Sequence, residues 1–224
     1  MKLAIFDFCD TLVGFQTADA FVDYVRKKNS SLFMQTLNIF LNVLTRLRVI
    51  ALCNKFFPGS AISKRVKLLQ LKGFNLEKLD KLAFLFYQDC IKPSFILPAI
   101  EEMKRLEGQG YDICIVSAGY SLYLKYFAED HDIKHVIATE IAFNQTGKVC
   151  SGTIVGKDCY YKEKVNRIKA YFAGQNINFK DSISFSDSIS DLPMLLLTGQ
   201  GVVVSKFKSQ EWSKQYKFNE IIWN

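Results

Sequence analysis

Three groups of polar residues follow short apolar runs, and together they could bind a metal ion and a phosphate. The groups are Asp7, Cys9, Asp10 and Thr11, then Ser117, Ala118 and Gly119, and then Ser186, Asp187, Ser188 and Asp191. Mg²⁺ prefers carboxylate and carbonyl oxygens, and a lysine such as Lys164 would offset the charge of a phosphate. Aspartates that follow strands also cap helices, but the joint pattern favours the metal and phosphate site over that structural role.

The elements that must position these groups are alternating strands and helices. Strand-like apolar runs cover 3–8, 111–116, 135–138, 182–185 and 201–204, and helical patterns cover 99–109, 121–129, 161–172 and 192–197. Residues 141–144 and 149–155 flank Gln145-Thr146-Gly147-Lys148 and predict a hairpin. This alternation predicts an α/β fold with a parallel sheet covered on both faces. Ligands bind beyond the carboxyl ends of such strands, so we expect the polar groups to converge there.

The segment 15–97 interrupts the alternation and has a helical pattern. Apolar residues recur at steps of three and four within 33–44 and again within 76–86, and Pro58-Gly59 separates the two groups. We therefore predict a core domain made of 1–14 and 98–224, and an all-helical domain, 15–97, inserted after the first strand. An insertion at that end of the sheet would cover the site as a cap.

The cap also carries the whole basic surplus of the chain. The formal net charge is +7, and residues 15–97 hold 13 Lys and Arg against 5 Asp and Glu. One interpretation is a solvated helical face, and the other is a surface for an anionic substrate or for peripheral contact with a membrane. No nucleic-acid-binding motif accompanies the charge, so we expect no nucleic-acid partner. The pattern does not indicate an oligomeric state.

The composition predicts a folded, cytoplasmic protein. Hydrophobic residues make up 49% of the 224 residues, with 12 Gly and 4 Pro, which excludes a disordered or collagen-like chain. The six cysteines include no CxxC pair, so we expect neither a zinc ribbon nor a disulfide framework. The apolar runs are shorter than the about 18 residues of a membrane span. Asp7 interrupts the first run, which argues against a signal peptide.

Four motifs occur in order between residues 5 and 194. They are Ile5-Phe6-Asp7-Phe8-Cys9-Asp10-Thr11-Leu12, Val116-Ser117-Ala118-Gly119, Cys159-Tyr160-Tyr161-Lys162-Glu163-Lys164-Val165, and Ser186-Asp187-Ser188-Ile189-Ser190-Asp191-Leu192-Pro193-Met194. In sequence and order they resemble the motifs of the haloacid-dehalogenase-like phosphohydrolase superfamily, in its phosphoserine-phosphatase-like branch. A helical insertion after the first motif is also typical of that branch. The resemblance implies a three-layer, Rossmann-like α/β core and a phosphatase activity.

The resemblance implies the nucleophile and the metal ligands. Asp7 would be the nucleophile and would form an aspartyl-phosphate. Mg²⁺ would be held by Asp7, the backbone carbonyl of Cys9 and Asp187. Asp191 would be a further ligand or would support the others.

The resemblance also implies the phosphate-binding groups. Ser117 and the backbone N–H groups beside it, in Ala118 and Gly119, would bind phosphoryl oxygens. Lys164 would neutralise charge on the nucleophile and the phosphoryl group. Lys162 is a weaker alternative for this role, because the helical phase of the segment favours Lys164.

Cys9 departs from the family pattern. The phosphatases of the family carry a second Asp at this place, which protonates the leaving oxygen and then activates water. A thiol, with an ordinary pKa of about 8.5, is a poor acid at neutral pH. Three alternatives are open: Asp10 turns inward and supplies the proton, the substrate has a good leaving group, or the protein is catalytically impaired and only binds an anionic ligand.

A second departure concerns the substrate. Phosphoserine phosphatases carry a Glu nine residues after the nucleophile, where it contacts the substrate's ammonium group, and this chain has Gln16 there. A neutral amide binds an ammonium group less well. We therefore expect a small-molecule phosphate other than phosphoserine, with a lipid-linked or nucleotide-linked phosphate as candidates.

Overall fold

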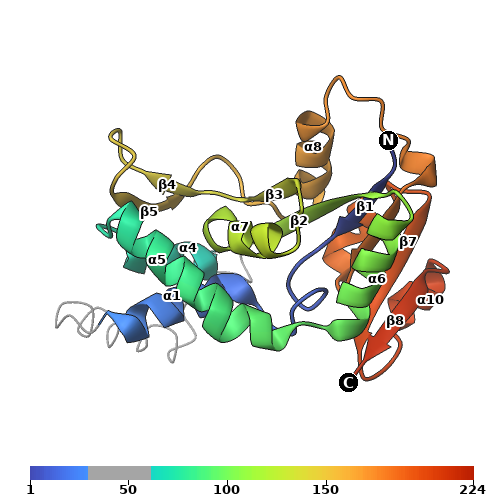
Figure 1. Ribbon diagram of the computed structural model, residues 1–224, viewed down its shortest axis with the longest axis horizontal. Helices are drawn as coiled ribbons and strands as arrows, with labels where there is room; N and C mark the ends of the chain where they lie inside the picture. The colour runs from blue at the N-terminus through green and yellow to red at the C-terminus, as the bar shows by residue number, and fades with distance from the viewer. Residues whose placement is uncertain (30–61) are drawn as a thin grey trace.

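A six-stranded parallel sheet forms the centre of the protein (Figure 1). The structure is a computed structural model, and it describes residues 1–29 and 62–224. The strand order is β3-β2-β1-β6-β7-β8. The strands are β1 (Leu3–Phe6), β2 (Asp112–Tyr120), β3 (His135–Thr139), β6 (Ile183–Ser186), β7 (Gln200–Lys206) and β8 (Asn219–Trp223). The predicted α/β fold with a parallel sheet is confirmed.

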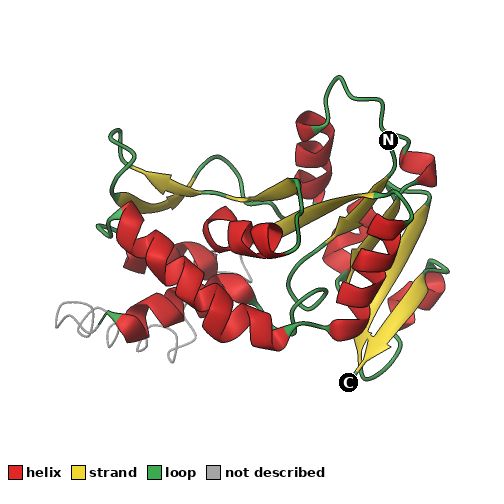
Figure 2. Ribbon diagram, viewed as in Figure 1, coloured by secondary structure: helices red, strands yellow, loops and turns green. Residues whose placement is uncertain are grey.

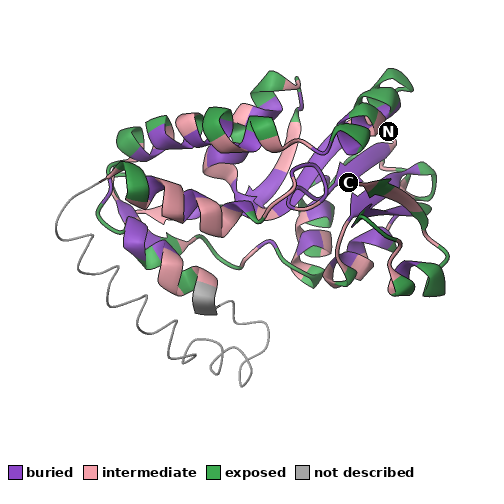
Figure 3. Ribbon diagram, turned by 90° about the horizontal axis from the view of Figure 1, so that it is seen from below, coloured by how far each residue is buried: buried purple, intermediate pink, exposed green. Residues whose placement is uncertain are grey.

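Helices cover both faces of this sheet (Figure 2). Side chains of a strand point alternately to the two faces, and β1 shows this clearly. Ala4 and Phe6 pack in the cluster that includes residues of α6 and α7, whereas Leu3 and Ile5 pack with residues of α8 and α9. The helices are α6 (Leu97–Gly108), α7 (Ser121–Asp130), α8 (Lys162–Tyr171) and α9 (Leu192–Leu195). The central strands are accordingly buried, while the outer faces of the helices are exposed (Figure 3).

The described parts of the segment 15–97 are helical. They contain α1 (Thr17–Lys28), α4 (Ile62–Leu68) and α5 (Leu76–Phe86), with shorter helical turns over Leu69–Leu71, Tyr87–Ile91 and Lys92–Ser94. In Figure 2 these helices lie together to one side of the sheet, away from β7 and β8. The helix predicted over 33–44, the break at Pro58-Gly59 and the basic residues of 46–55 lie outside the described residues.

The predicted hairpin consists of β4 (Ile141–Phe143) and β5 (Cys150–Ile154), which pair antiparallel. It packs against the helical segment and hydrogen-bonds to its backbone. The N–H of Gly73 donates to the carbonyl of Cys150 at 2.9 Å, and the N–H of Cys150 donates to the carbonyl of Phe74 at 2.8 Å. Gly152, at φ +77°, allows this approach, because a Cβ there would lie 3.1 Å from the Cα of Leu69. The hairpin and the helical segment therefore form one connected layer.

The C-terminal residues form the short helix α10 (Glu211–Gln215) and the edge strand β8, parallel to β7. Among the described residues, the helices are all too short or too polar to cross a bilayer.

Candidate active site

A cavity of about 490 Å³ lies at the edge of the sheet where β1, β2 and β6 end. It is lined by polar residues from every predicted group, namely Asp7, Cys9, Ser117, Ala118, Gly119, Lys164, Asp187, Ser188 and Asp191. The strand order explains this convergence. Strand β1 lies between β2 and β6, and parallel strands present their carboxyl ends at the same edge. Ala18, Asp19 and Lys64 also line the cavity, so it lies between the core and the described helices of the insertion.

A buried lysine joins two carboxylates on the wall of this cavity. Lys164 Nζ donates to Asp7 Oδ1 at 2.7 Å and to Asp191 Oδ2 at 2.6 Å, and Lys164 is only 2% exposed. Burial raises the pKa of Asp7 to about 6, although the charge of Lys164 opposes this shift. Burial favours the neutral amine of Lys164, but the charges of Asp7 and Asp191 outweigh it and raise the pKa of Lys164. Near neutral pH the Asp7 carboxylate and the Lys164 ammonium group are therefore both charged.

Asp187 faces the same two carboxylates from the end of β6. Its N–H donates to the hydroxyl oxygen of Thr11 at 3.0 Å. Burial, followed by repulsion from Asp7 and other nearby carboxylates, raises the pKa of Asp187 to about 8. A bound cation would relieve this repulsion, because it favours the charged form of every carboxylate around it.

The donor set fits Mg²⁺ by its chemistry. Asp191 is 2% exposed, and its Oδ1 is buried with no hydrogen-bond partner among the described residues. Asp7, Asp187 and Asp191 offer the hard oxygen ligands that Mg²⁺ takes, and the cavity leaves room for the waters it retains. Within the described ranges, no three His, Cys, Asp or Glu side chains are already arranged around one point as metal ligands. The chemistry of these residues fits the ion, and in this structure Lys164 pairs with two of the three carboxylates, Asp7 and Asp191.

The residues that the motifs predict to bind phosphate lie at an irregular end of strand β2. The register of β2 with β3 shifts between Ser117 and Tyr120, so that Ala118 and Gly119 bulge out of the ladder. Ser117 is fully buried, and its Oγ accepts a hydrogen bond from the N–H of Gly119 at 2.9 Å. The bulge thus turns a hydroxyl and backbone groups towards the cavity that Asp7 also lines.

Gly119 is closely surrounded, which predicts the result of a substitution. A Cβ there would lie 2.7 Å from the phenol oxygen of Tyr123 and 3.2 Å from the hydroxyl oxygens of Ser117 and Thr17. We expect Gly119→Ala to lower the free energy of unfolding by about 1–3 kcal/mol, because the neighbours must shift. Urea unfolding measures this. Gly108→Ala is the matched control, since nothing lies within 4 Å of its Cβ position; equal midpoints for the two variants would contradict the prediction.

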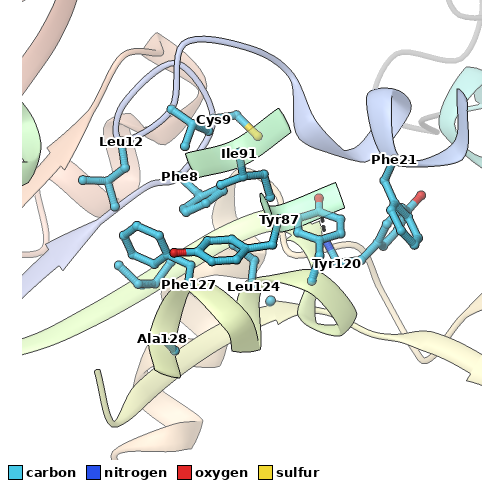
Figure 4. Packing of buried hydrophobic residues seen from close by; sticks show 14 of the residues in the cluster. Phe8, Cys9, Leu12, Phe21, Tyr87, Ile91, Tyr120, Leu124, Phe127 and Ala128 are labelled. Atoms are coloured by element: carbon cyan, nitrogen blue, oxygen red, sulfur yellow. Dashed lines mark hydrogen bonds between the residues drawn. The ribbon is translucent and has the colours of Figure 1, made fainter. Parts of the chain in front are cut away.

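The thiol of Cys9 lines the cavity at the border of the large hydrophobic cluster (Figure 4). Its Sγ lies 3.1 Å from the hydroxyl oxygen of Thr17 and accepts from the N–H of Thr17 at 3.4 Å. Burial, reinforced by the charge of Asp7, raises the pKa of Cys9 to about 12. The hydroxyl of Thr17 in turn lies 2.7 Å from that of Tyr123, which accepts from the N–H of Tyr120. The thiol is therefore protonated at neutral pH and held in a fixed place.

Asp10 and Gln16 contact each other rather than the nucleophile. Asp10 adopts φ +53°, a region that Asp tolerates better than most residues, and its N–H donates to the carbonyl of Val13 at 2.7 Å. Its carboxylate accepts from the Gln16 amide at 2.7 Å. Of these two residues, Gln16 lines the cavity and Asp10 does not. This arrangement weakens the alternative in which Asp10 supplies the proton.

Lys64 and Asp158 are among the residues of the cavity wall that the sequence-based prediction of the site does not include. Lys64, in α4, donates to the backbone carbonyl of Ala118 and, at 2.7 Å, to Asp158 Oδ1. Asp158 also accepts from the hydroxyl of Thr139, at the end of β3. In the sequence Lys64 is one of many basic residues of the cap, and no local pattern separates it from the others. The contact links α4 directly to the bulge at the end of β2.

Comparison with known proteins gives two curated relatives with the same activity in their names. The chain is 24% identical over 201 residues to the phosphoserine phosphatase of Methanocaldococcus jannaschii, covering 88% of this chain and 82% of that protein. It is 30% identical over 107 residues to the phosphoserine phosphatase of Streptococcus thermophilus, covering 46% and 47%.

Solved structures share the fold. A protein of unknown function from Bordetella pertussis Tohama I superposes with a TM-score of 0.78 at 22% identity, over 98% of this chain and 97% of that one. A phosphoserine phosphatase in its apo form superposes with a TM-score of 0.62 at 19% identity, over 97% and 98%.

The family model of haloacid dehalogenase-like hydrolases matches residues 4–196. That range contains all four motifs and every residue of the predicted site. It also contains the whole described cap. The chain therefore belongs to the haloacid dehalogenase-like hydrolases.

Proposed function

We propose that the protein is a Mg²⁺-dependent phosphatase that acts through an aspartyl-phosphate on Asp7. Its substrate is a phosphomonoester or an activated phosphate other than phosphoserine. The observation that carries this proposal is the ion-paired triad of Asp7, Lys164 and Asp191 on the wall of a cavity that also contains the Ser117–Gly119 bulge. The names of the two curated relatives support the reaction class.

The reaction runs in two displacements. A carboxylate oxygen of Asp7 attacks phosphorus, and the bond from phosphorus to the leaving oxygen breaks with its electron pair. Water then attacks the same phosphorus, and the acyl-phosphate bond breaks to give inorganic phosphate and the Asp7 carboxylate. Lys164 offsets the repulsion between the carboxylate and the phosphate, and donors of the bulge bind the phosphoryl oxygens. When bound by Asp7, Asp187, Asp191 and the Cys9 carbonyl, Mg²⁺ would neutralise the phosphoryl charge further.

The leaving oxygen receives little help from this chain. The Cys9 thiol, with its pKa raised to about 12, is a poor proton donor, and the Asp10 carboxylate is bound to Gln16. General acid catalysis typically contributes about 10²–10⁴-fold. The substrate that suits this site therefore has a leaving group that departs as a stable anion, such as an acyl phosphate, an anhydride or an aryl ester.

An assay with two leaving groups tests the proposal. We expect Mg²⁺-dependent phosphate release from 4-nitrophenyl phosphate that stops on chelation, and release from ethyl phosphate that is slower by about 10²-fold or more. Equal rates for both esters would mean that some group does protonate the leaving oxygen. If neither ester turns over while Mg²⁺ and phosphate together raise Tm, the protein binds an anionic ligand without hydrolysing it, and the proposed function fails.

A further inference from the structure

A second cavity, of about 330 Å³, adjoins the first. Lys64, Asp158 and Tyr160 line both cavities, so the two are continuous along these residues. The second cavity lies between α4, the end of β5 and the start of α8, and therefore on the cap side of the site. A substrate with its phosphate at the Ser117–Gly119 bulge could extend past Lys64 into this space. We refer to it as the distal cavity.

Basic residues without carboxylate partners line the distal cavity. Lys64 is paired with Asp158, and Glu163 lies 3.6 Å from Arg167. No carboxylate of residues 1–29 or 62–224 lies within ion-pair distance of Arg65, Lys157 or Lys162, the other cations of its wall. Unpaired cations that surround one space raise the local concentration of anions there. Three such cations are more than are needed to bind a ligand with a single carboxylate group.

The rest of the wall is aromatic and apolar. Tyr160 and Tyr161 are 48% and 44% exposed and both line the distal cavity, and Tyr160 also lines the first cavity. Tyr161 has φ +53°, a conformation that is uncommon for an aromatic residue and that clusters at ligand sites. Leu68 and Ile154 complete the wall. The distal cavity thus has an apolar and aromatic wall with cations around it. Such a wall suits a substrate whose uncharged spacer ends in a dianion.

We propose that the physiological substrate carries a second phosphoryl group on its leaving group, and that Arg65, Lys157 and Lys162 bind it in the distal cavity. This inference rests on the proposed function, because the scissile phosphate is the one placed next to Asp7. A phosphoryl dianion accepts hydrogen bonds from several cations at once, which a carboxylate does less well. The tyrosines and the apolar wall contact the spacer between the two phosphates.

Competition with matched pairs of ligands tests the proposal. The probes are straight-chain alkanediol bisphosphates of increasing length, each compared with the monophosphate of the same diol, as inhibitors of 4-nitrophenyl phosphate hydrolysis. We expect the inhibition constant of the bisphosphate to be at least about tenfold lower than that of the monophosphate at one spacer length. Hexose 1,6-bisphosphate and adenosine 3′,5′-bisphosphate, each against its monophosphate, distinguish a sugar spacer from a nucleoside spacer.

For each variant we compare the ratio of two inhibition constants, that of the monophosphate divided by that of the bisphosphate. Lys157→Ala with Lys162→Ala should reduce the ratio to about one, because the second phosphoryl group loses two cations. Lys134→Ala with Lys169→Ala removes the same charge from exposed positions outside both cavities and should keep the ratio. A ratio of one in the native protein at every spacer length, or a ratio that survives the Lys157 and Lys162 substitutions, overturns the proposal.

The two proposals fail separately. If the native protein releases no phosphate from any ester, the proposed function is wrong. The same ratio is then measured as dissociation constants by calorimetry in the presence of Mg²⁺. A tenfold preference for bisphosphates would support the distal site in a binding protein, and the absence of a preference would contradict it.

Discussion

Asp7→Asn should reduce phosphate release from 4-nitrophenyl phosphate by at least about 10⁴-fold, because an amide cannot form the acyl-phosphate. The substitution keeps the shape of the side chain, and the carboxamide oxygen can still accept the hydrogen bond that Lys164 Nζ donates at 2.7 Å. The fold should therefore remain intact. Initial rates at saturating Mg²⁺ measure the loss, and far-ultraviolet circular dichroism checks the fold.

The control for this variant is Asp132→Asn. Asp132 lies in the exposed turn between α7 and β3, at the opposite end of the sheet, and its φ of +53° suits Asn as well as Asp. Its rate should match that of the native protein. A folded Asp7→Asn protein that retains more than a small fraction of the native rate would exclude the aspartyl-phosphate mechanism.

Cys9→Asp should raise the turnover of ethyl phosphate by about 10²-fold or more, because it introduces the carboxyl group that can protonate the leaving oxygen. The surroundings of residue 9 can accommodate a carboxyl group. The Cys9 side chain lines the cavity, and the N–H and hydroxyl of Thr17 surround its sulfur and could donate to a carboxylate. Turnover of 4-nitrophenyl phosphate should change much less, since 4-nitrophenolate leaves without a proton. The ratio of kcat/KM for the two esters measures the effect.

Cys9→Ser is the matched control, since it keeps a small polar side chain but supplies no acid. It should show no gain with ethyl phosphate. If Cys9→Asp folds and binds Mg²⁺ without any gain, proton donation does not limit this enzyme. If Cys9→Ser instead loses activity on ethyl phosphate, the native thiol itself takes part in proton transfer.

Much of the fold can be predicted because its strands are buried on both faces. Leu3–Phe6 in β1 and residues 113–116 in β2 are buried and stand out as apolar segments. Strand β8 could not be predicted in this way. It lies at the edge of the sheet and its residues, Asn219–Trp223, are half-buried or exposed, so neither an apolar run nor a strict alternation marks it. Its pairing with β7 is decided by tertiary contacts.

The site shows the same division between local pattern and tertiary placement. Residues at strand ends, such as Asp7 and Asp187, can be predicted to converge because parallel strands share an edge. The contact of Lys64 with Asp158 joins residues 94 positions apart and depends on how the cap lies on the core. The hydrogen bond between Asp10 and Gln16 depends on the turn at φ +53°, which the sequence does not mark with a glycine.

The central place of β1 in the sheet bears on how this enzyme emerges from the ribosome. Strand β1, which ends directly before Asp7, precedes the other strands in the chain, yet it pairs with β2, which begins at Asp112, and with β6, which begins at Ile183. A nascent chain therefore holds β1 unpaired until β2 has been synthesised, and with one edge unpaired until β6 follows. Such late, long-range pairing slows folding and leaves apolar segments exposed to aggregation and to chaperones. The cavity that Asp7 and Asp191 line together can form only after Asp191 has left the exit tunnel.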